Sequence, residues 1–469
     1  MPSPRKYLSV AAVVSTSAIL LASCSSGSSS SSSTTSASAT SSACSSATLD
    51  KATKPVQLTF WESAARANLT VLTQLTNQFN ASQSKVHVNL VTQTSYADTW
   101  QKYQAGLTNN QLPDLVQLQD SDTQGAIDTQ SFESVQSCYA GFKYSTGDLL
   151  PRALAYWNVN KTQWAMPFAV SGLVLYYNKQ AFTKAGITTP PATLSDLVSD
   201  AAKLKAAGLG GMGLKLDPWQ FETWLATANQ TLVNNENGRS ARATKVSFDT
   251  PTGESIFSNL DQMVKAGDAS TNSALGSDEF DNLLGTGSGK YSMTIDTSAA
   301  LGTIESLLSS GQYPNVTLGV APFPTATTNP KGGVDPAGSA LWISKKSSAL
   351  NQSAAFDFAE FLTNTESQTT WAAGTGYIPL RTSSANSATM TKLYANDPGF
   401  KVAYTQLLNG PETPATAGPV LGPYDDVRTA IAAGESSMLI SGVAPAKALS
   451  GAATASNQII SSYNTRLGG

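Results

Sequence analysis

The sequence predicts an α/β fold with room for two packed domains. Its 469 residues, of which 41% are hydrophobic and 13% charged, are enough to build two hydrophobic cores. Between residues 56 and 119 the patterns run strand, helix, strand, helix, strand. This alternation is typical of a lobe built on a mainly parallel sheet.

The elements of this first stretch follow from hydrophobic periodicity. Apolar residues at alternate positions predict a strand at residues 56–60, and apolar residues at helical spacing predict a helix over 69–79. The sequence KVHVNLV predicts a second strand. Ser95 and Asp98 are spaced as a capping box, which predicts a helix leading to the strand DLVQLQ.

The same reasoning extends along the chain. SGLVLYYNK predicts a strand, and a helix is expected from the capping box of Thr193 and Asp196 to a stop at Gly208. SAAFDFAEFL carries its apolar residues on one helical stripe. TESQTTWAAG predicts a short capped helix that ends at Gly374.

The glycine-rich run GTGSGKYSMTID, residues 285–296, resembles a phosphate-binding loop only at first sight. A P-loop has the spacing G-x-x-x-x-G-K-[ST] between a strand and a helix. Here Leu284 stands where the first glycine belongs, and Tyr291 follows the lysine. We therefore expect a helix before the glycines, a turn, and a strand after them.

Catalytic and metal-binding motifs are scarce. The chain has one histidine, His87, on the polar face of a predicted strand, and it contains neither G-x-S-x-G nor H-E-x-x-H. We expect no metal, no cofactor and no catalytic residue. A pair of carboxylates, as in glycosidases, stays open as an alternative. The net charge of −3 argues against nucleic acid as a partner.

The N-terminus predicts export. Arg5 and Lys6 precede an apolar run that ends in Leu-Ala-Ser-Cys at Cys24, which predicts a lipoprotein signal peptide over residues 1–23. The pattern resembles a bacterial lipobox. It implies that Cys24 is lipidated and anchors the chain to the outer face of the cytoplasmic membrane. An ordinary signal peptide with an incidental cysteine is the alternative.

A tether and a disulfide are the next expectations. Residues 24–54 are rich in serine and should link the anchor to the folded part. Once Cys24 is lipidated, Cys44 and Cys138 remain. In an exported protein they can form a disulfide, although two unrelated thiols are equally compatible with the sequence.

Several blocks together resemble one known family. The run from MPFAVSG to KLKAAG, together with GSALWISKKSS, AAFDFAEFLTNTESQTTWAAGTGYIPLR and GSGKYSMTID, resembles the ABC-transporter extracellular solute-binding proteins of the carbohydrate type (family 1). TFWES, SYADT, VQLQD, TGYIPL and LNGPETPATAGPVLG resemble the branch that contains glycerol-3-phosphate-binding proteins. The likeness runs from LTFWES to AKAL.

The resemblance implies a two-lobe periplasmic-binding-protein-like fold (class II), with the ligand cleft between the lobes. Lobe 1 would comprise residues 55–170 with 321–364, and lobe 2 residues 171–320 with 365–469. The protein would be a monomer without enzymatic activity. It would pass a small polyhydroxylated solute to the transmembrane permease subunits of an ABC importer, and only its lipid would enter the membrane.

The resemblance also implies a set of ligand contacts. In the chemistry of such sites, carboxylates and hydroxyls bond sugar hydroxyls, a glycine admits the backbone, and an aromatic ring packs on a carbon skeleton. Without the resemblance, each aromatic residue would pass for core packing and Asp120 for a helix cap. The implied contacts are Tyr96, Asp120, Ser171, Ser298, Gly338 and Tyr377, with Trp219 or Trp224 as the aromatic surface.

One departure from this branch bears on the ligand. The glycerol-3-phosphate relatives tend to have an arginine where this chain has Val420, and Arg428 lies nearby but is shifted. Because phosphate recognition usually needs an arginine, we expect a neutral sugar or oligosaccharide. The alternatives are a glycerol-3-phosphate or glycerophosphodiester receptor, a secreted carbohydrate-active enzyme, and a surface adhesin.

Overall fold

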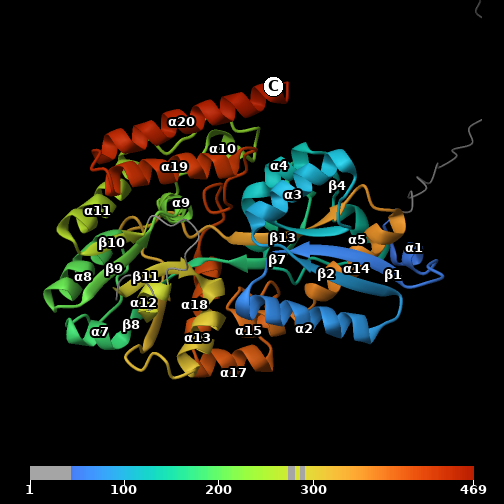
Figure 1. Cartoon of the computed structure of the whole chain (residues 1–469), viewed down its shortest axis with the longest axis horizontal. Coiled ribbons are helices and arrows are strands. Elements are labelled where there is room, and N and C mark those ends of the chain that lie inside the picture. The colour runs from blue at the N-terminus through green and yellow to red at the C-terminus, as the bar shows by residue number, and fades with distance from the viewer. Residues whose placement is uncertain (1–43, 273–279, 286–290, 469) are drawn as a thin grey trace, which may run out of the picture. The chain divides into compact units, whose positions relative to one another are not determined.

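Two separate β-sheets organise the protein, as Figure 1 shows for the computed structural model. The structure describes residues 44–272, 280–285 and 291–468. We call each sheet, with the helices packed on it, a lobe. The predicted α/β fold class and its two lobes are confirmed.

The first lobe contains a mixed sheet of order β2-β1-β3-β13-β4, with β7 also paired to β13. Its β1 runs parallel to β2 and β3, whereas β13 is antiparallel to its neighbours. The strands are β1 (Val56–Glu62), β2 (Val86–Thr92), β3 (Leu115–Gln119), β4 (Phe132–Glu133), β7 (Met166–Ser171) and β13 (Ala337–Ser344). The helices are α1 (Ser46–Leu49), α2 (Arg66–Ser82), α3 (Tyr96–Asn109), η1 (Asp120–Asp122), α4 (Thr123–Asp128), α5 (Gln136–Phe142), α6 (Pro151–Tyr156), α14 (Ala349–Leu362) and α15 (Thr365–Thr375).

The second lobe contains a sheet of order β10-β9-β11-β8-β12. Its strands are β8 (Leu173–Asn178), β9 (Gly210–Lys215), β10 (Ala269–Asn272), β11 (Tyr291–Thr297) and β12 (Leu318–Pro322). Its helices are α7 (Lys179–Lys184), α8 (Leu194–Ala206), α9 (Pro218–Thr227), α10 (Asn234–Gly238), α11 (Pro251–Ala266), α12 (Phe280–Leu284), η2 (Ser298–Ala300), α13 (Leu301–Ser309), α18 (Gly399–Asn409), α19 (Tyr424–Leu439) and α20 (Pro445–Arg466).

The chain passes between the sheets at two clear points. Only Gly172 separates β7 of the first sheet from β8 of the second, and residues 323–336 lead back from β12 to β13. Short helices α16 (Thr382–Ala385) and α17 (Ala388–Asn396) then connect α15 to α18, and β5 (Asn158–Val159) pairs with β6 (Thr162–Gln163) in a separate hairpin. The lobe bounds predicted from the sequence stay a prediction.

One part of those bounds differs from the packing. They assign residues from 365 onward to lobe 2, yet α15 packs against α2 of the first lobe. The reason is Trp371, which is buried in the first lobe's core and stacks on Phe168 at 4.8 Å between ring centroids. The helix also ends later than predicted, at Thr375, because Gly376 rather than Gly374 adopts the left-handed conformation, at φ 91°.

The joint between the lobes is held by a buried arginine. Arg152 of α6 is 7% exposed, and its guanidinium donates to the carbonyl oxygens of Leu407, Val334 (2.6 Å) and Thr416 (3.1 Å). These carbonyls belong to the end of α18, to the connection 323–336 and to the loop 410–423. The Arg152 side chain therefore links α6 to three segments near the connections between the lobes.

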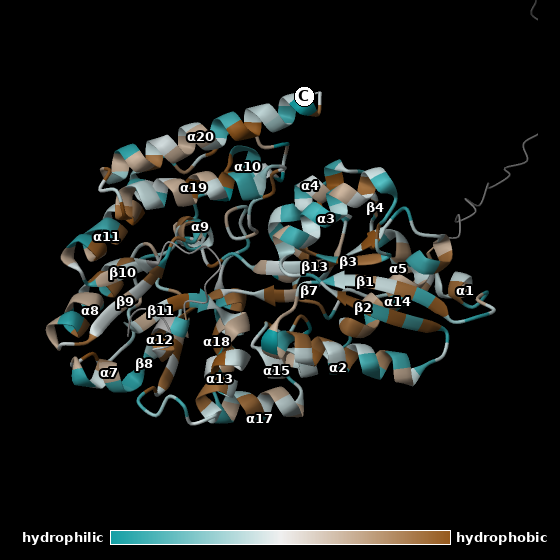
Figure 2. Ribbon diagram, in the orientation of Figure 1, coloured by the Kyte–Doolittle hydropathy of each residue, from teal (hydrophilic) through white to brown (hydrophobic). Residues whose placement is uncertain are grey.

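Other expectations about local structure can be checked directly. The capping box is present, with Asp196 N donating to Thr193 Oγ1 and Thr193 N to Asp196 Oδ2. His87 is exposed, as predicted. Figure 2 shows hydrophobic and hydrophilic residues alternating along α2. The turn predicted in the glycine-rich run lies mostly at residues 286–290, outside the described residues.

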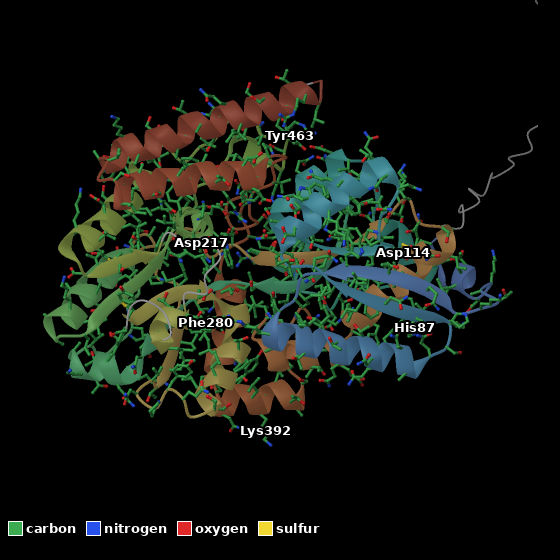
Figure 3. The ribbon with its side chains drawn as sticks, in the orientation of Figure 1. His87, Asp114, Asp217, Phe280, Lys392 and Tyr463 are labelled. Atoms are coloured by element: carbon green, nitrogen blue, oxygen red, sulfur yellow. A yellow bond between two sulfur atoms is a disulfide. The ribbon has the colours of Figure 1, made fainter. Side chains whose placement is uncertain are left out.

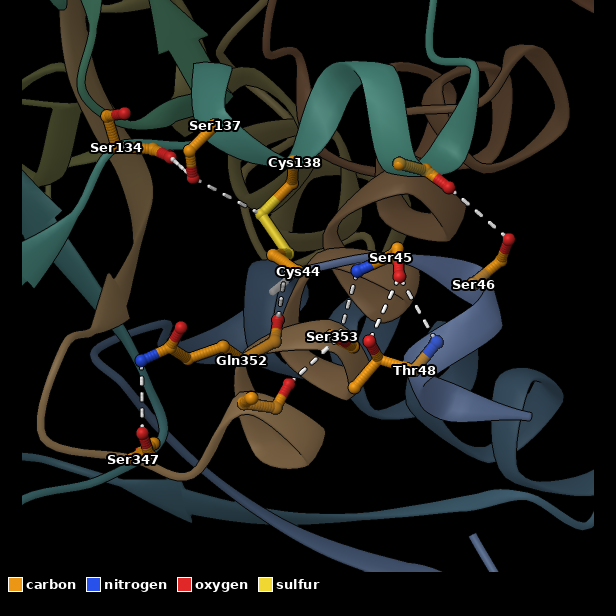
Figure 4. The surroundings of a disulfide bond; sticks show 12 residues. Cys44, Ser45, Ser46, Thr48, Ser134, Ser137, Cys138, Ser347, Gln352 and Ser353 are labelled. Carbon is orange, nitrogen blue, oxygen red and sulfur yellow. Dashed lines mark hydrogen bonds between the residues drawn. A yellow bond between two sulfur atoms is a disulfide. The ribbon is translucent and has the colours of Figure 1, made fainter. Parts of the chain in front are cut away.

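The N-terminal boundary of the folded part lies earlier than expected. The predicted tether reached residue 54, but the structure joins Cys44 to Cys138 in a disulfide, with Cα atoms 4.9 Å apart. In Figure 4 the residues that follow Cys44 pack against α14, where Ser45 N donates to Ser353 Oγ at 3.1 Å. Leu49 is buried in the same core. The disulfide and this burial explain why residues 44–49 fold with the first lobe.

Candidate functional site: a cavity between the lobes

A cavity of about 410 Å³ is lined by residues of both lobes. The first lobe contributes the start of α2, the start of α3 and the end of β3, and the second contributes the end of β9 and the starts of α9 and α13. In Figure 3, Asp217 and Phe280 mark the second-lobe side, far from His87. The lining residues are Ala65, Arg66, Asn68, Tyr96, Gln119, Ser171, Lys215, Asp217, Trp219, Phe280, Thr297, Ala299, Ala300, Thr303, Ala337, Gly338, Tyr377 and Arg428.

The structure brings together most of the residues implied by the resemblance. Tyr96, Ser171, Trp219, Gly338 and Tyr377 line the cavity. As ligand contacts they stay predictions, because the structure holds no ligand. The fold brings these five residues together from distant positions of the sequence.

Ser298 and Asp120 lie directly behind this lining. Ser298 is 4% exposed and its N–H donates to the carbonyl of Gly172, the residue that joins the two sheets. Asp120 is 1% exposed, and its Oδ2 accepts from Gly338 N at 3.2 Å. Both residues are therefore buried in the protein, directly behind the residues that line the cavity.

Trp224 is placed elsewhere. It is 1% exposed within the second lobe's core, its Nε1 donates to Pro324 O at 3.0 Å, and its ring lies 5.3 Å from that of Phe323. Trp219 lines the cavity instead. The helix explains the difference, since residues five apart on α9 point about 140° away from each other at 100° per residue.

Glycine at position 338 is required by a close approach. Its φ is 133°, and a Cβ atom there would lie 1.9 Å from the carbonyl oxygen of Ala169 on β7. An L-residue would be strained by the backbone conformation as well as by this contact. The half-buried backbone of Gly338 can thus form part of the cavity wall while its N–H donates to Asp120.

Tyrosine hydroxyls form a second polar group. Tyr96 OH donates to Ser339 Oγ at 3.1 Å, and Gln117 Nε2 donates to both of these oxygens, at 3.3 and 2.7 Å. Burial raises the pKa of Tyr96 and of Tyr377 above the usual range. Both phenols therefore stay protonated at neutral pH, and the single O–H of Tyr96 is already donated to Ser339 Oγ.

Arg428 of α19 carries a guanidinium that is already paired. Its Nε lies 3.1 Å from Glu222 Oε1 and its Nη2 2.8 Å from Oε2, while Tyr424 OH donates to the same carboxylate at 2.8 Å. The guanidinium lies over the Tyr424 ring at 4.3 Å. Its Nη1 faces Asp120 Oδ1 at 3.6 Å. Two carboxylates thus surround one cation.

Burial dominates the acid–base chemistry of this cluster. Desolvation raises the pKa of Asp120 to about 6, although Arg428 acts in the opposite direction. Asp335, in the connection between β12 and β13, is also buried, and desolvation followed by repulsion from Glu222 raises its pKa to about 7. Both carboxyls therefore titrate near physiological pH.

Sequence reasoning missed several lining residues. Lys215 is the last residue of β9, Asp217 follows it, and Asn68 lies in the first turn of the helix after β1; α/β proteins place ligands at such carboxyl ends of strands. Asn68 Oδ1 and Trp219 Nε1 are buried, and neither has a hydrogen-bond partner within the described part of the chain. One acceptor and one donor are thus available in the cavity. The predicted ends of the two strands were the sequence signal that could have identified these lining residues.

Val420 does not take the place of the missing arginine. It is 2% exposed and its N–H donates to Asn237 O at 2.9 Å, which fixes the loop 410–423 against α10. Arg428, eight positions later, reaches the cavity instead.

The comparisons with known proteins agree with this architecture. Residues 74–402 match the family of bacterial extracellular solute-binding proteins, and the chain belongs to this family. Among curated relatives, the sn-glycerol-3-phosphate-binding periplasmic protein UgpB of Yersinia pestis bv. Antiqua (strain Antiqua) is 26% identical over 399 residues, covering 83% of this chain and 89% of the relative. The UgpB of Escherichia coli O1:K1 is 26% identical over 427 residues, covering 88% and 94%.

Solved structures share the fold. UgpB from Mycobacterium tuberculosis in complex with glycerophosphocholine superimposes with a TM-score of 0.74 at 20% identity, covering 87% of this chain and 99% of that one. The GacH receptor of Streptomyces glaucescens GLA.O, solved unliganded and with acarbose, gives a TM-score of 0.72 at 21% identity, covering 87% and 98%. By the family match, this protein is a solute-binding protein of an ABC importer. Within the described residues, no helix is both long and apolar enough to span a membrane.

Proposed function

We propose that the solute is uncharged and polyhydroxylated, a sugar or an oligosaccharide, and that the lobes close over it before delivery to the permease. The observation that supports an uncharged ligand is the state of Arg428. Glu222 pairs two of its nitrogens and Asp120 faces the third. A phosphate at this position would meet two carboxylates together with the cation.

The lining suits a sugar in other respects. Trp219, Phe280 and Tyr377 supply aromatic surface, on which the apolar face of a pyranose ring can pack. Between them, Asn68 Oδ1 accepts and Trp219 Nε1 donates, which matches hydroxyl groups that do both. A cavity of this size lies within the usual range for small-molecule sites, about 300–1,000 Å³.

A glycerol-3-phosphate or glycerophosphodiester ligand is the second candidate. It is favoured by the names of the curated relatives and by the presence of Arg66 and Lys215 in the lining. Among the described residues at the cavity, however, these two cations and Arg428 are matched by Asp217, Asp120 and Glu222. The charges at the cavity therefore balance, which favours the neutral ligand.

A thermal-shift screen tests the class of ligand. The exported domain is heated alone and with mono- and oligosaccharides, sn-glycerol 3-phosphate or glycerophosphocholine. A ligand at 100 times its Kd stabilises the native state by about 2.7 kcal/mol. A shift with a neutral sugar supports the proposal, and a shift confined to the phosphate compounds overturns it.

A secreted carbohydrate-active enzyme or an adhesin would be a different class of protein. Small-angle scattering on the ligand found in the screen separates them. A receptor becomes more compact on binding and returns the ligand unchanged. Product formation would indicate the enzyme, and binding without compaction would indicate the adhesin.

The export signal completes the proposal. We propose that Cys24 is lipidated and that the protein works as a monomer on the outer face of the cytoplasmic membrane. Mass spectrometry of the mature N-terminus tests this directly. A diacylated Cys24 is expected, and a mature chain that begins elsewhere would contradict it.

A further inference from the structure

Glu222 is a buried carboxylate with a specific partner at the cavity. It lies on α9, is 3% exposed, and holds Nε and Nη2 of Arg428 at 3.1 and 2.8 Å. Tyr424 OH donates to the same carboxylate, so both oxygens are occupied. No ligand is needed to keep this carboxylate in place.

Only one nitrogen of Arg428 then remains toward the first lobe. This Nη1 lies 3.6 Å from Asp120 Oδ1, and Arg428 lines the cavity. An anion that approached this nitrogen would therefore meet the negative charge of Asp120, and Glu222 on the other edge of the guanidinium would offset part of the attraction of the cation. Proteins often obtain specificity by placing such a repulsive group against the wrong ligand.

We propose that Glu222 sets the charge selectivity of the cleft: by neutralising Arg428 it excludes phosphorylated solutes and leaves the cavity to neutral ones. This inference rests on the proposed function, because it explains how the same cleft rejects an anion. It assigns to Glu222 a selectivity role without contact between Glu222 and the ligand. Arg428 is the residue through which it acts.

The test is the substitution Glu222→Gln, with binding of sn-glycerol 3-phosphate measured by calorimetry. Glutamine has nearly the same shape but no charge, so Arg428 becomes an available partner for phosphate. We expect the affinity for sn-glycerol 3-phosphate to rise at least tenfold over wild type. The gain should weaken as salt is added, and it should vanish in the double variant Glu222→Gln, Arg428→Gln.

A matched control separates this pairing from general electrostatics. Asp217→Asn removes one negative charge from the cavity lining, while asparagine still caps α9 by accepting from Trp219 N. It should give a smaller gain than Glu222→Gln, because Asp217 has no bond to Arg428 among the described contacts. An equal gain in Asp217→Asn would overturn the assignment to Glu222.

Each remaining outcome is decisive. A folded Glu222→Gln protein with no gain in phosphate affinity overturns the inference, as does a gain that survives in the double variant. If Glu222→Gln does not unfold cooperatively, Asp120→Asn removes the other carboxylate beside Arg428 and carries the same expectation. Wild-type protein that already prefers sn-glycerol 3-phosphate to every neutral sugar would instead contradict the proposed function itself.

Discussion

Arg428 of the second lobe faces Asp120 of the first, with Nη1 3.6 Å from Oδ1. Asp120 in turn accepts from Gly338 N on β13, where β13 pairs with β7. The carboxylate of Asp120 thus connects Arg428 of the second lobe with β13 of the first. Asp120 therefore contacts both the cavity wall, through Gly338 N, and the opposite lobe, through Arg428.

Replacing Asp120 should therefore affect ligand binding more than folding. In Asp120→Ala, Gly338 N and Arg428 Nη1 both lose their partner, so the wall of the cavity loses its fixed geometry. We expect at least a tenfold loss of affinity for the neutral ligand, which corresponds to about 1.4 kcal/mol. Calorimetric titration measures it, with cooperative unfolding as the control, and unchanged affinity would remove Asp120 from the site.

Trp219 should bind through its indole N–H as well as its ring. Trp219→Phe keeps an aromatic surface but removes the buried donor Nε1. We expect an affinity loss of about fivefold, since a typical hydrogen bond contributes about 1 kcal/mol. Trp224→Phe is the matched control, because Trp224 Nε1 bonds to Pro324 O in the core. It should lower the melting temperature and leave affinity unchanged, and the reverse pattern would refute this placement.

Asp335 should make the protein less stable as the pH rises. Burial raises its pKa to about 7 from 3.8, so between about pH 4 and pH 7 the folded protein keeps a proton that the unfolded chain has lost. Stability therefore falls with increasing pH across this window. Asp120, with its pKa raised to about 6, acts in the same direction.

The substitution Asp335→Asn should remove its share of this dependence. Asparagine keeps an oxygen that can accept from Thr223 Oγ1 but has no proton to lose. Thermal unfolding between pH 4.5 and pH 7.5 should show little difference at the acid end and a more stable variant at pH 7.5. Asp249→Asn, at an exposed position, controls for net charge. A constant difference at every pH would show that Asp335 does not titrate in this window.

Local signals in the sequence predicted most elements of the fold. The box of Thr193 and Asp196 marks the start of α8 because both of its hydrogen bonds are local. Pairing between distant residues has no such local signature. The sequence could not decide between a Cys44–Cys138 disulfide and two thiols. Nor could it reveal that Trp371 is buried in the first lobe's core, so that α15 packs on that lobe.

The site was predicted only as far as the resemblance reached. It implied Tyr96 and Gly338 as ligand contacts, and both line one cavity, although their sequence separation gives no sign of contact. It offered no basis for choosing Trp219 over Trp224, which needs the orientation of α9. It could not reveal that Arg428 is neutralised by Glu222, because that pair joins two helices 206 residues apart.

A competition titration tests the central claim most directly. Wild-type protein is titrated with the neutral sugar that gives the largest thermal shift, first alone and then in the presence of excess sn-glycerol 3-phosphate. We expect saturable binding with a stoichiometry of about one, because the predicted contacts gather at a single cavity, and no change caused by the phosphate compound. Displacement of the sugar by sn-glycerol 3-phosphate, or no binding of any neutral sugar, would contradict the account.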